Sequence, residues 1–314
     1  MKDNPNKKYT LAKKYKVTDE YNLVRLDNCL FSQLRYLPRS KVYSIIRKGE
    51  VRVNGSRSKP YRKLKIGDIV RIPPHIVTER KISLPSKSLE DILKDNIVFN
   101  KESILVINKP VGLASHGGSG ISLGLIEAIR QINSEFRQAQ LVHRLDRETS
   151  GCIVLALKKS VLRKLNQELR EGRVEKKYLA IVKGEWSRDF QLVKSNLIKN
   201  VLRSGEREVR TSSSGKEART EFTLIKKHKG LSLIGCRLLT GRTHQIRVQI
   251  SNLGHPIIGD KKYGDSETNH IFKKMGVNRM LLHSKSISFP RLNFSCTTDV
   301  PEVFNKIMGD EEGK

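Results

Sequence analysis

The chain has 314 residues, of which 37% are hydrophobic, and its 61 Lys and Arg against 32 Asp and Glu give a formal net charge of +29. This length suits about two domains with a sizeable core, and the charge argues against an enzyme of small neutral metabolites and for a polyanionic partner. Because no apolar run approaches the ~20 residues of a membrane span and no secretion signal is recognisable, we expect a soluble, cytoplasmic protein that does not bind membranes.

The first segment, residues 1–22, is rich in lysine and has no clear apolar period. We therefore expect it to be a flexible basic lead-in. The four cysteines lie far apart among apolar neighbours, without a Cys-x-x-Cys pair or matching histidines. We expect them to be buried and unbridged, and a zinc site is improbable.

Residues 23–84 have the pattern of a small helix-and-hairpin domain. In SKVYSIIRKGEV, Ser40 is a candidate N-cap and Gly49 a helix end, and in VRVNGSR the Asn54-Gly55 pair predicts a tight hairpin. A strand follows in LKIGDIVRIP. The predicted helix carries a cationic face for RNA, made of Arg39, Lys41, Arg47 and Lys48.

This stretch resembles the small RNA-binding module that is named after a small-subunit ribosomal protein. The resemblance lies in VRLDNCL, SKVYSIIRKGEVRVNG and KLKIGDIVRI, over about fifty residues. An ordinary solvated basic face on a minor domain is the alternative. Asp27 lies in an Arg-Leu-Asp triplet here, so that triplet alone does not identify a catalytic acid.

Residues 85–309 begin with a connector that contains a short helix and continue as a strand-rich domain. The predicted strands are SILVIN, GCIVLAL, YLAIVKG, ARTEFTLI, LSLIGCRLL and MLLHSKSISF. Two helices interrupt them, SVLRKLNQELREG with Ser160 as its cap and THQIRVQISNLG. The fold class is therefore α+β, mainly antiparallel with peripheral helices, followed by an acidic tail over residues 310–314.

Asp146 lies in LVHRLDRETSG, between two arginines and directly before an apolar strand. A tight loop anchored to a rigid strand is a favoured place for a reactive side chain. Arg144 and Arg147 would keep the carboxylate ionised, which suits a nucleophile better than a proton donor. A structural ion pair, or phosphate-binding arginines beside an incidental acid, is the alternative.

A second polar cluster follows in LTGRTHQIRVQISNLGHPIIGDKKYG, where basic side chains stand at the start of a predicted helix. A helix start with basic side chains is a ready site for anions. We expect Arg242 to reach across and pair with Asp146. Contact with the RNA backbone is the alternative for this cluster, and it fits Arg247 better than Arg242.

Together the two clusters resemble the pseudouridine synthases that modify large-subunit ribosomal RNA. HRLDRETSG, KKYLAIVKGEW, TGRTHQIRVQISNLGHPIIGDKKYGD and LLHSKSISFP stand in the family's order, and the resemblance covers nearly the whole chain from about Val24. It implies an isomerase that detaches the base of a uridine, turns it and rejoins it through carbon five, without cofactor or metal. It also implies that Asp146 attacks the substrate, at the uracil ring or at the anomeric carbon, or assists elimination.

The resemblance implies roles for further residues. Tyr178 stacks on the uracil and its hydroxyl assists a proton transfer, Arg242 pairs with the aspartate, and Leu282 contacts the base; core packing is the alternative for Tyr178 and Leu282. Arg144 and His143 would fill the gap left by a flipped nucleotide or grip its phosphate, and His116 on a glycine-rich loop would line the RNA groove. Gln249 and Ser284 depart from the family's usual histidine and alanine.

These features predict isomerisation of uridines in large-subunit (23S) ribosomal RNA, by a monomer that could also meet ribosome assembly intermediates. A non-catalytic RNA-binding assembly protein is the alternative from another class. It would need the arginines but has no use for Asp146 together with Tyr178. A sister synthase that acts on small-subunit ribosomal RNA or transfer RNA is the third possibility.

Overall fold

The computed structural model describes residues 7–34, 37–78, 84–117, 121, 123–201 and 207–309. Contacts divide the chain into two compact units, residues 1–82 and 83–314. The boundary expected from the sequence lies two residues later, and the acidic tail lies outside the described residues. Within the described part of the chain, no helix combines the length and the apolar character that crossing a bilayer requires.

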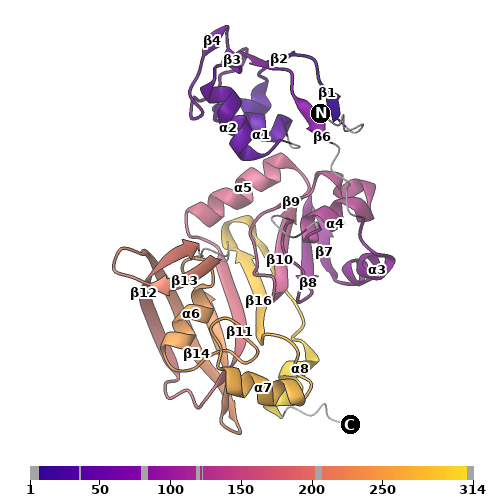
Figure 1. The fold of residues 1–314 in the computed structure, drawn as a ribbon. Coiled ribbons are helices and arrows are strands. Elements are labelled where there is room, and N and C mark those ends of the chain that lie inside the picture. The colour runs from indigo at the N-terminus through magenta and orange to yellow at the C-terminus, as the bar shows by residue number, and fades with distance from the viewer. Residues whose placement is uncertain are drawn as a thin grey trace. The chain divides into compact units, whose positions relative to one another are not determined.

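The described part of unit 1 consists of short strands and short helices (Figure 1). In chain order they are β1 (Lys7–Tyr9), β2 (Lys13–Lys16), η1 (Asp19–Tyr21), α1 (Leu26–Gln33), α2 (Arg39–Arg47), β3 (Arg52–Val53), β4 (Ser56–Arg57), β5 (Ile69–Ile72) and β6 (Ile76–Thr78). Apolar side chains of α1, α2 and the sheet β2-β5-β3-β4 form one core, which includes Leu30, Val42, Ile45 and Val70. The helix-and-hairpin prediction is confirmed.

Two local predictions in unit 1 have different outcomes. The hairpin between β3 and β4 turns at Asn54 and Gly55, whose φ angles of 52° and 77° suit a two-residue turn of the primed type. Helix α2 instead begins at Arg39, with Pro38 at its N-cap, so Ser40 is not the cap. A proline fits this position because the first helical residues have no intrahelical acceptor for their N–H groups.

The prediction of a flexible lead-in is wrong for residues 7–9 and 13–16. The first of these segments is β1, which pairs with β6, and the second is β2, which pairs with β5 at the edge of the four-stranded sheet. Backbone hydrogen bonds hold an edge strand without an apolar period, and lysines on it discourage pairing with another chain. A polar, lysine-rich segment therefore does not exclude a strand.

Unit 2 contains one large sheet with helices around it (Figure 1). Its elements up to β12 are α3 (Lys87–Asp95), β7 (Ile97–Lys101), β8 (Ile104–Lys109), α4 (Leu125–Ile132), η2 (Ser134–Gln138), β9 (Gln140–Leu141), β10 (Ser150–Ala156), α5 (Lys159–Arg170), β11 (Glu175–Lys183) and β12 (Phe190–Val201). The remaining elements are β13 (Arg207–Thr211), β14 (Lys216–His228), β15 (Leu231–Leu238), α6 (Gln245–Asn252), α7 (Ser266–Lys274), β16 (Leu282–Phe289), η3 (Pro290–Leu292), β17 (Phe294–Thr297) and α8 (Glu302–Met308).

The strands of unit 2 are ordered β13-β12-β14-β15-β11-β16-β10-β8-β7, with β17 paired to β16 and β9 to β10. Among the described strands, β10 and β16 form the one parallel pair, and the other pairs are antiparallel. The predicted α+β, mainly antiparallel fold is confirmed. Helix α5 starts at Lys159, so Ser160 is its second residue and not its cap.

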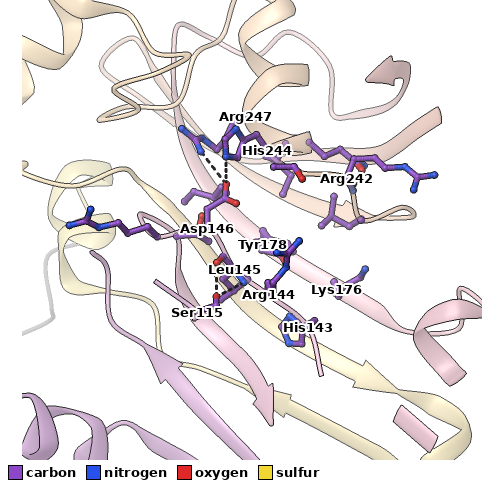
Figure 2. Close-up of a pocket in the computed structure, with 18 of the residues that line it drawn as sticks. Ser115, His143, Arg144, Leu145, Asp146, Lys176, Tyr178, Arg242, His244 and Arg247 are labelled. Atoms are coloured by element: carbon purple, nitrogen blue, oxygen red, sulfur yellow. Dashed lines mark hydrogen bonds and ion pairs between the residues drawn. The ribbon is translucent and has the colours of Figure 1, made fainter. Parts of the chain in front are cut away.

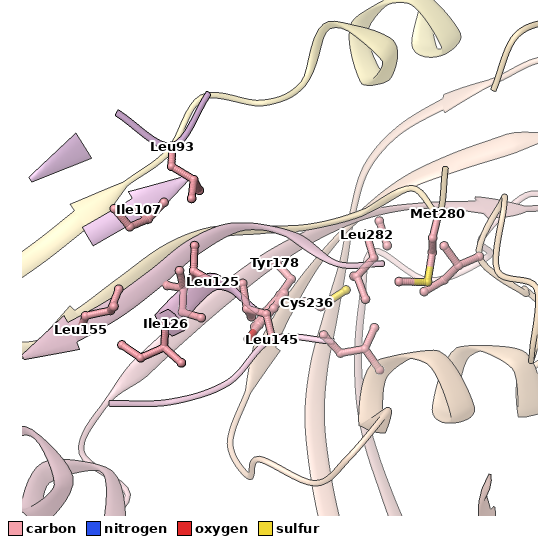
Figure 3. Close-up of a cluster of buried hydrophobic side chains, with 14 of the residues drawn as sticks. Leu93, Ile107, Leu125, Ile126, Leu145, Leu155, Tyr178, Cys236, Met280 and Leu282 are labelled. Carbon is pink, nitrogen blue, oxygen red and sulfur yellow. The ribbon is translucent and has the colours of Figure 1, made fainter. Parts of the chain in front are cut away.

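The centre of the sheet is buried on both faces. All residues of β10 are buried, and its alternate side chains enter two separate cores. Ile153 and Leu155 pack with α3, α4 and α6 on one face, while Cys152 and Val154 pack with α5 on the other. Figure 3 shows the first core, in which Leu145, Tyr178 and Leu282 lie among the buried side chains.

The sequence reasoning missed α4, α7 and α8, which are 8, 9 and 7 residues long. A helix of this length shows only about two turns of apolar period, so packing rather than pattern stabilises it. All four cysteines are buried as predicted, and they are free.

Candidate active site

Asp146 lies in a cavity of about 610 Å³ that opens on unit 2. Most of its wall comes from stretches that are distant in sequence: residues 114–116 with Ile121, the loop 143–149, the start of β11, and residues 238–247 (Figure 2). The predicted residues His116, His143, Arg144, Tyr178, Arg242, Arg247 and Leu282 all line this cavity. The structure therefore brings both sequence clusters to one site.

The loop that carries Asp146 is anchored on both sides of the carboxylate. Leu145 is only 7% exposed and packs in the first core. Its backbone N–H donates to Ser115 Oγ (3.0 Å), and Ser115 Oγ donates to the Leu145 carbonyl (2.7 Å). After the loop, Gly151 has φ +104°, and a Cβ there would lie 2.3 Å from the Ser284 carbonyl. Only glycine lets β10 approach β16 this closely.

Lys109, at the end of β8, anchors the loop that carries Asp146. The sequence did not predict this role. Lys109 is fully buried, and its Nζ donates to the carbonyls of Pro110 (2.9 Å), Leu113 (2.8 Å) and Arg147 (3.2 Å). Burial lowers its pKa to about 7, against the opposing influence of nearby carboxylates. A lysine that ends an apolar strand is the sequence signal that points to it.

Arg247, not Arg242, pairs with Asp146. Its Nη1 lies 3.1 Å from Asp146 Oδ2 and donates a hydrogen bond to it. Arg242 is exposed, its Nε donates to the Glu217 carbonyl (3.0 Å), and Figure 2 shows its side chain directed away from Asp146. The prediction for Arg242 is wrong because α6 begins at Gln245, which places Arg247 in the first turn and leaves Arg242 in the preceding loop.

The burial of Arg247 also argues against the RNA-backbone contact that the sequence suggested for it. Its side chain is 8% exposed, and Asp260 holds it through two bonds, Nε to Oδ2 (2.7 Å) and Nη2 to Oδ1 (2.8 Å). Burial opposes the charge on Asp260, yet the bonds from Arg247 lower its pKa overall. Asp260 thus fixes Nε and Nη2 of the guanidinium, and the remaining nitrogen, Nη1, faces Asp146.

His244 faces the same oxygen of Asp146 as Arg247 does. Its Nε2 is 3.7 Å from Asp146 Oδ2, and its Nδ1 hydrogen-bonds the Tyr263 hydroxyl (2.9 Å). Burial lowers the pKa of His244, so the neutral imidazole is favoured at neutral pH. The residue has φ 52°, a left-handed backbone that is uncommon outside glycine and often marks a functional site.

Tyr178 and Leu282 form the apolar side of the cavity. Both belong to the first core, at 7% and 3% exposure, and both line the cavity. Burial raises the pKa of the Tyr178 phenol, with an opposing influence from the Ser284 hydroxyl, so the phenol is neutral. Core packing of both side chains is confirmed, and both also line the cavity, where the predicted contact with a base stays a prediction.

Cations surround the rest of the cavity. Arg144 is exposed, and its Nη1 lies 3.4 Å from Nε2 of His116, which is also exposed. Lys176, which the sequence reasoning missed, lines the same wall, and burial lowers its pKa. Lys199, an exposed lysine of β12, also lines the cavity. An electropositive wall of this kind suits a phosphate.

His143 does not suit the phosphate contact predicted for it. Its Nε2 accepts a hydrogen bond from the Val154 N–H (3.1 Å), which ties the ring to β10. Burial lowers its pKa to about 4, so the imidazole is neutral. The ring lines the cavity as a structural neighbour of Arg144.

The predicted RNA-binding cations of unit 1 lie on α2 and directly after it. Arg39, Lys41 and Arg47 belong to α2, Lys48 follows it, and all four are exposed. The guanidinium of Arg39 lies over the Phe31 ring, 4.8 Å from its centroid.

Comparisons with known proteins agree with this geometry. The family model described as RNA pseudouridylate synthase matches residues 103–252, and the model described as S4 domain matches residues 24–70. A ribosomal large subunit pseudouridine synthase C from Haemophilus influenzae is 44% identical over 87% of this chain and 85% of that protein. The chain belongs to the pseudouridine synthase family. It is an RNA pseudouridine synthase, with an S4 module in unit 1.

Two further relatives support the assignment. A ribosomal large subunit pseudouridine synthase C from Escherichia coli is 47% identical over 84% of each chain. The solved structure of human RNA pseudouridylate synthase domain containing 4 superposes with a TM-score of 0.58, at 26% identity, over 69% of this chain and 93% of that chain. The family predicted from the motifs is therefore confirmed.

Proposed function

We propose that this synthase isomerises uridines of large-subunit ribosomal RNA to pseudouridine, with Asp146 as the nucleophile. The support for the RNA comes from the relatives that match this chain over most of its length, which are ribosomal large subunit pseudouridine synthases, and from its charge of +29. The observation that carries the reaction is the carboxylate of Asp146, held by a buried arginine inside a cavity that Tyr178 closes from one side.

The two oxygens of Asp146 are not equivalent. Oδ2 accepts the bond from Arg247 and faces His244, whereas within the described residues Oδ1 has no hydrogen-bond donor. Oδ1 is therefore the atom that attacks. Arg247 stabilises the carboxylate before the attack and again after the bond between Asp146 and the substrate breaks. Overall, the N1–C1′ bond breaks and a C5–C1′ bond forms, while C5 loses a proton and N1 gains one.

Tyr178 fits a role beside the base. Its ring offers a flat apolar surface on which uracil stacks, and its neutral phenol is a hydrogen-bond donor within the same cavity. Because the phenol is protonated, it acts as a relay: its oxygen accepts the proton that C5 loses while its own proton passes on to N1, so that it ends neutral. We assign it the proton transfer that follows the rejoining of the base at C5.

The target nucleotide enters the cavity only after it leaves its stack, because a base within a helix cannot turn about its sugar. Such flipping costs a few kcal/mol. Arg144, His116 and Lys176 at the cavity wall offset part of this cost by contact with the phosphates of the flipped nucleotide. Arg242, exposed beside the same wall, joins this set.

The decisive experiment replaces Asp146 by Asn, which keeps the shape and removes the charge. Pseudouridine formation should fall by at least about 10³-fold, because no nucleophile remains, while RNA affinity changes little. Tritium release from labelled RNA measures the first quantity and fluorescence anisotropy the second. Retained turnover would refute the assignment of Asp146. Pseudouridine mapping in cells that lack the protein tests the RNA: unchanged large-subunit RNA would refute the substrate.

We also propose that the enzyme acts in the cytoplasm as a monomer and meets its RNA in ribosome assembly intermediates. A target uridine can leave its stack and reach the enzyme more easily before the subunit is fully packed, which supports the assembly stage. Light scattering of the purified protein tests the monomer, and a dimeric mass would contradict it. Co-sedimentation with subunit precursors rather than mature subunits tests the stage.

A further inference from the structure

Unit 1 contains a second cavity, separate from the Asp146 site. Its volume is about 590 Å³, and it lies between the C-terminal half of α2 and the segment 57–60 that follows β4. The apolar part of its wall is Tyr43, Ile46 and Pro60. A hollow with an aromatic ring and two aliphatic side chains fits a flat, partly apolar molecule.

Tyr43 is fixed in place without being covered. Its hydroxyl donates to Oδ2 of the buried Asp27 (3.2 Å), and its ring meets Phe31 edge to face with centroids 5.6 Å apart. Even so, Tyr43 is 39% exposed. An exposed ring whose orientation is set from two sides loses little conformational entropy when another ring stacks on it.

The rest of the wall is cationic. Arg47, Arg57 and Lys59 line the cavity, all three are exposed, and no acidic residue lines it within the described residues. Arg57 crosses the backbone of Gly49, where a Cβ would lie 2.4 Å from its Nε. The glycine at the end of α2 therefore makes room for the guanidinium. A positive rim around an apolar floor is the charge pattern that complements a nucleotide.

Ser58 also lines the cavity, but its Oγ is buried and makes no hydrogen bond within the described residues. The contacts available to a ligand therefore come from the Tyr43 ring, the aliphatic side chains and the three cations.

We propose that this cavity binds one unpaired nucleotide of the RNA substrate. Its base stacks on Tyr43 against Ile46 and Pro60, and its flanking phosphates contact Arg47, Arg57 and Lys59. A base that is paired within a helix cannot enter. The S4 module therefore distinguishes a single-stranded site from a plain duplex, beyond holding the RNA backbone. This inference rests on the proposed function, since it needs an RNA substrate.

The test compares two RNA probes on the full-length protein: a blunt hairpin, and the same hairpin with a short single-stranded extension. Tyr43→Leu should weaken binding to the extended probe roughly ten-fold or more, because stacking on one base contributes on the order of 1–3 kcal/mol. Binding to the blunt hairpin should stay unchanged. Tyr43→Phe keeps the ring and should bind like the wild type, as should Ile66→Ala, a control at an exposed apolar residue outside the cavity.

A second pair of variants tests the cations. Arg47→Gln with Lys59→Gln should lower the slope of log affinity against log salt by about 1.4 on the extended probe, at about 0.7 per phosphate contact of a single strand. Lys14→Gln with Lys16→Gln, two exposed lysines of β2, removes the same charge away from the cavity and should change the slope less.

These measurements test the cavity assignment separately from the proposed function. Equal weakening of both probes by Tyr43→Leu, or none, overturns the cavity as a base site. Circular dichroism and urea unfolding identify a variant that has lost its fold. If Tyr43→Leu has lost it, the charge variants decide: an equal change of slope in the Arg47 and Lys59 pair and in the Lys14 and Lys16 pair overturns the cavity as a nucleotide site. Pseudouridine formation by the wild-type enzyme tests the proposed function separately: it persists if only the cavity assignment fails.

Discussion

The position of Asp146 depends on Asp260, a residue that does not line the cavity. Arg247 lies between the two carboxylates, bound twice to Asp260 and once to Asp146. Because the guanidinium is planar, two bonds to Asp260 fix the direction of the third. The position of the nucleophile is thus set by a buried pair whose second member, Asp260, is 1% exposed.

Asp260→Asn tests this dependence. We expect pseudouridine formation to fall roughly 10²-fold, because the misdirected arginine no longer holds Asp146, and stability to fall by about 3 kcal/mol, because a buried cation loses its partner. Single-turnover kinetics and urea unfolding measure the two effects. Asp265→Asn removes an acid from the same segment that contacts Thr268 and Lys183 instead. It should leave turnover intact; equal loss in both variants would contradict the role of Asp260.

Tyr178→Phe separates the ring of this residue from its hydroxyl. The ring remains to stack on uracil, so RNA affinity should change little, while turnover should fall on the order of 10²-fold if the phenol transfers a proton. Rates at saturating RNA measure this. Full turnover in the phenylalanine variant would limit Tyr178 to stacking.

At the scale of elements, the parallel pair of β10 and β16 supports the loop of Asp146. Ser150 lies opposite His283 in this pair, and its Oγ hydrogen-bonds His283 Nδ1 (2.9 Å) and accepts a short bond from Arg279 Nη2 (2.5 Å). On its other side, His283 Nε2 bonds Thr298 Oγ1 (3.0 Å). A buried polar chain therefore connects the strand after the loop to the end of β17.

This chain predicts how stability depends on pH. Burial lowers the pKa of His283 to about 3, so the folded protein holds it neutral while the unfolded chain protonates it near its ordinary value of 6.5. Its contribution to stability is therefore complete above pH 6.5 and is lost as the pH falls toward 3. Between pH 7 and pH 5 the loss should be about 2 kcal/mol.

Urea unfolding of wild type and His283→Gln at both pH values measures that loss, since glutamine keeps hydrogen-bonding capacity without the titration. The variant should show a shallower decline in unfolding free energy. His270→Gln, at an exposed histidine of α7, should decline like the wild type. Parallel declines in all three proteins would refute a buried neutral His283.

At the scale of the whole molecule, charge and chemistry are divided between the two units. The +29 charge attracts RNA at long range. In the proposed function, the exposed cations of α2 hold the RNA backbone and the cavity of unit 2 acts on one base. Phosphate contacts carry little sequence information. Selectivity must therefore come from the shape of the RNA and from which uridine can leave its stack.

Salt dependence tests this division. Replacement of Arg39, Lys41, Arg47 and Lys48 by glutamine should flatten the slope of log affinity against log salt by about three to four, at about 0.9 per phosphate contact, and leave turnover at saturating RNA unchanged. Binding titrations over a range of salt give the slope. Replacement of Lys13, Lys14, Lys16 and Lys65, exposed elsewhere in unit 1, is the matched control; the same loss of slope there would show a non-specific effect of charge.

Local patterns explain how much the sequence alone determined. The Asn54-Gly55 turn, the alternating buried strands and the ordered motifs around Asp146 each depend on neighbours in the chain, so the α+β fold, the S4 module, the family and the site of Asp146 could be predicted. Only the tertiary structure decided which arginine pairs with Asp146, because Asp146 and Arg247 are 101 positions apart and α6 sets which side chain faces the loop. The same holds for Asp260 and Lys109: a charge becomes a positioning group only when the fold buries it beside its partner.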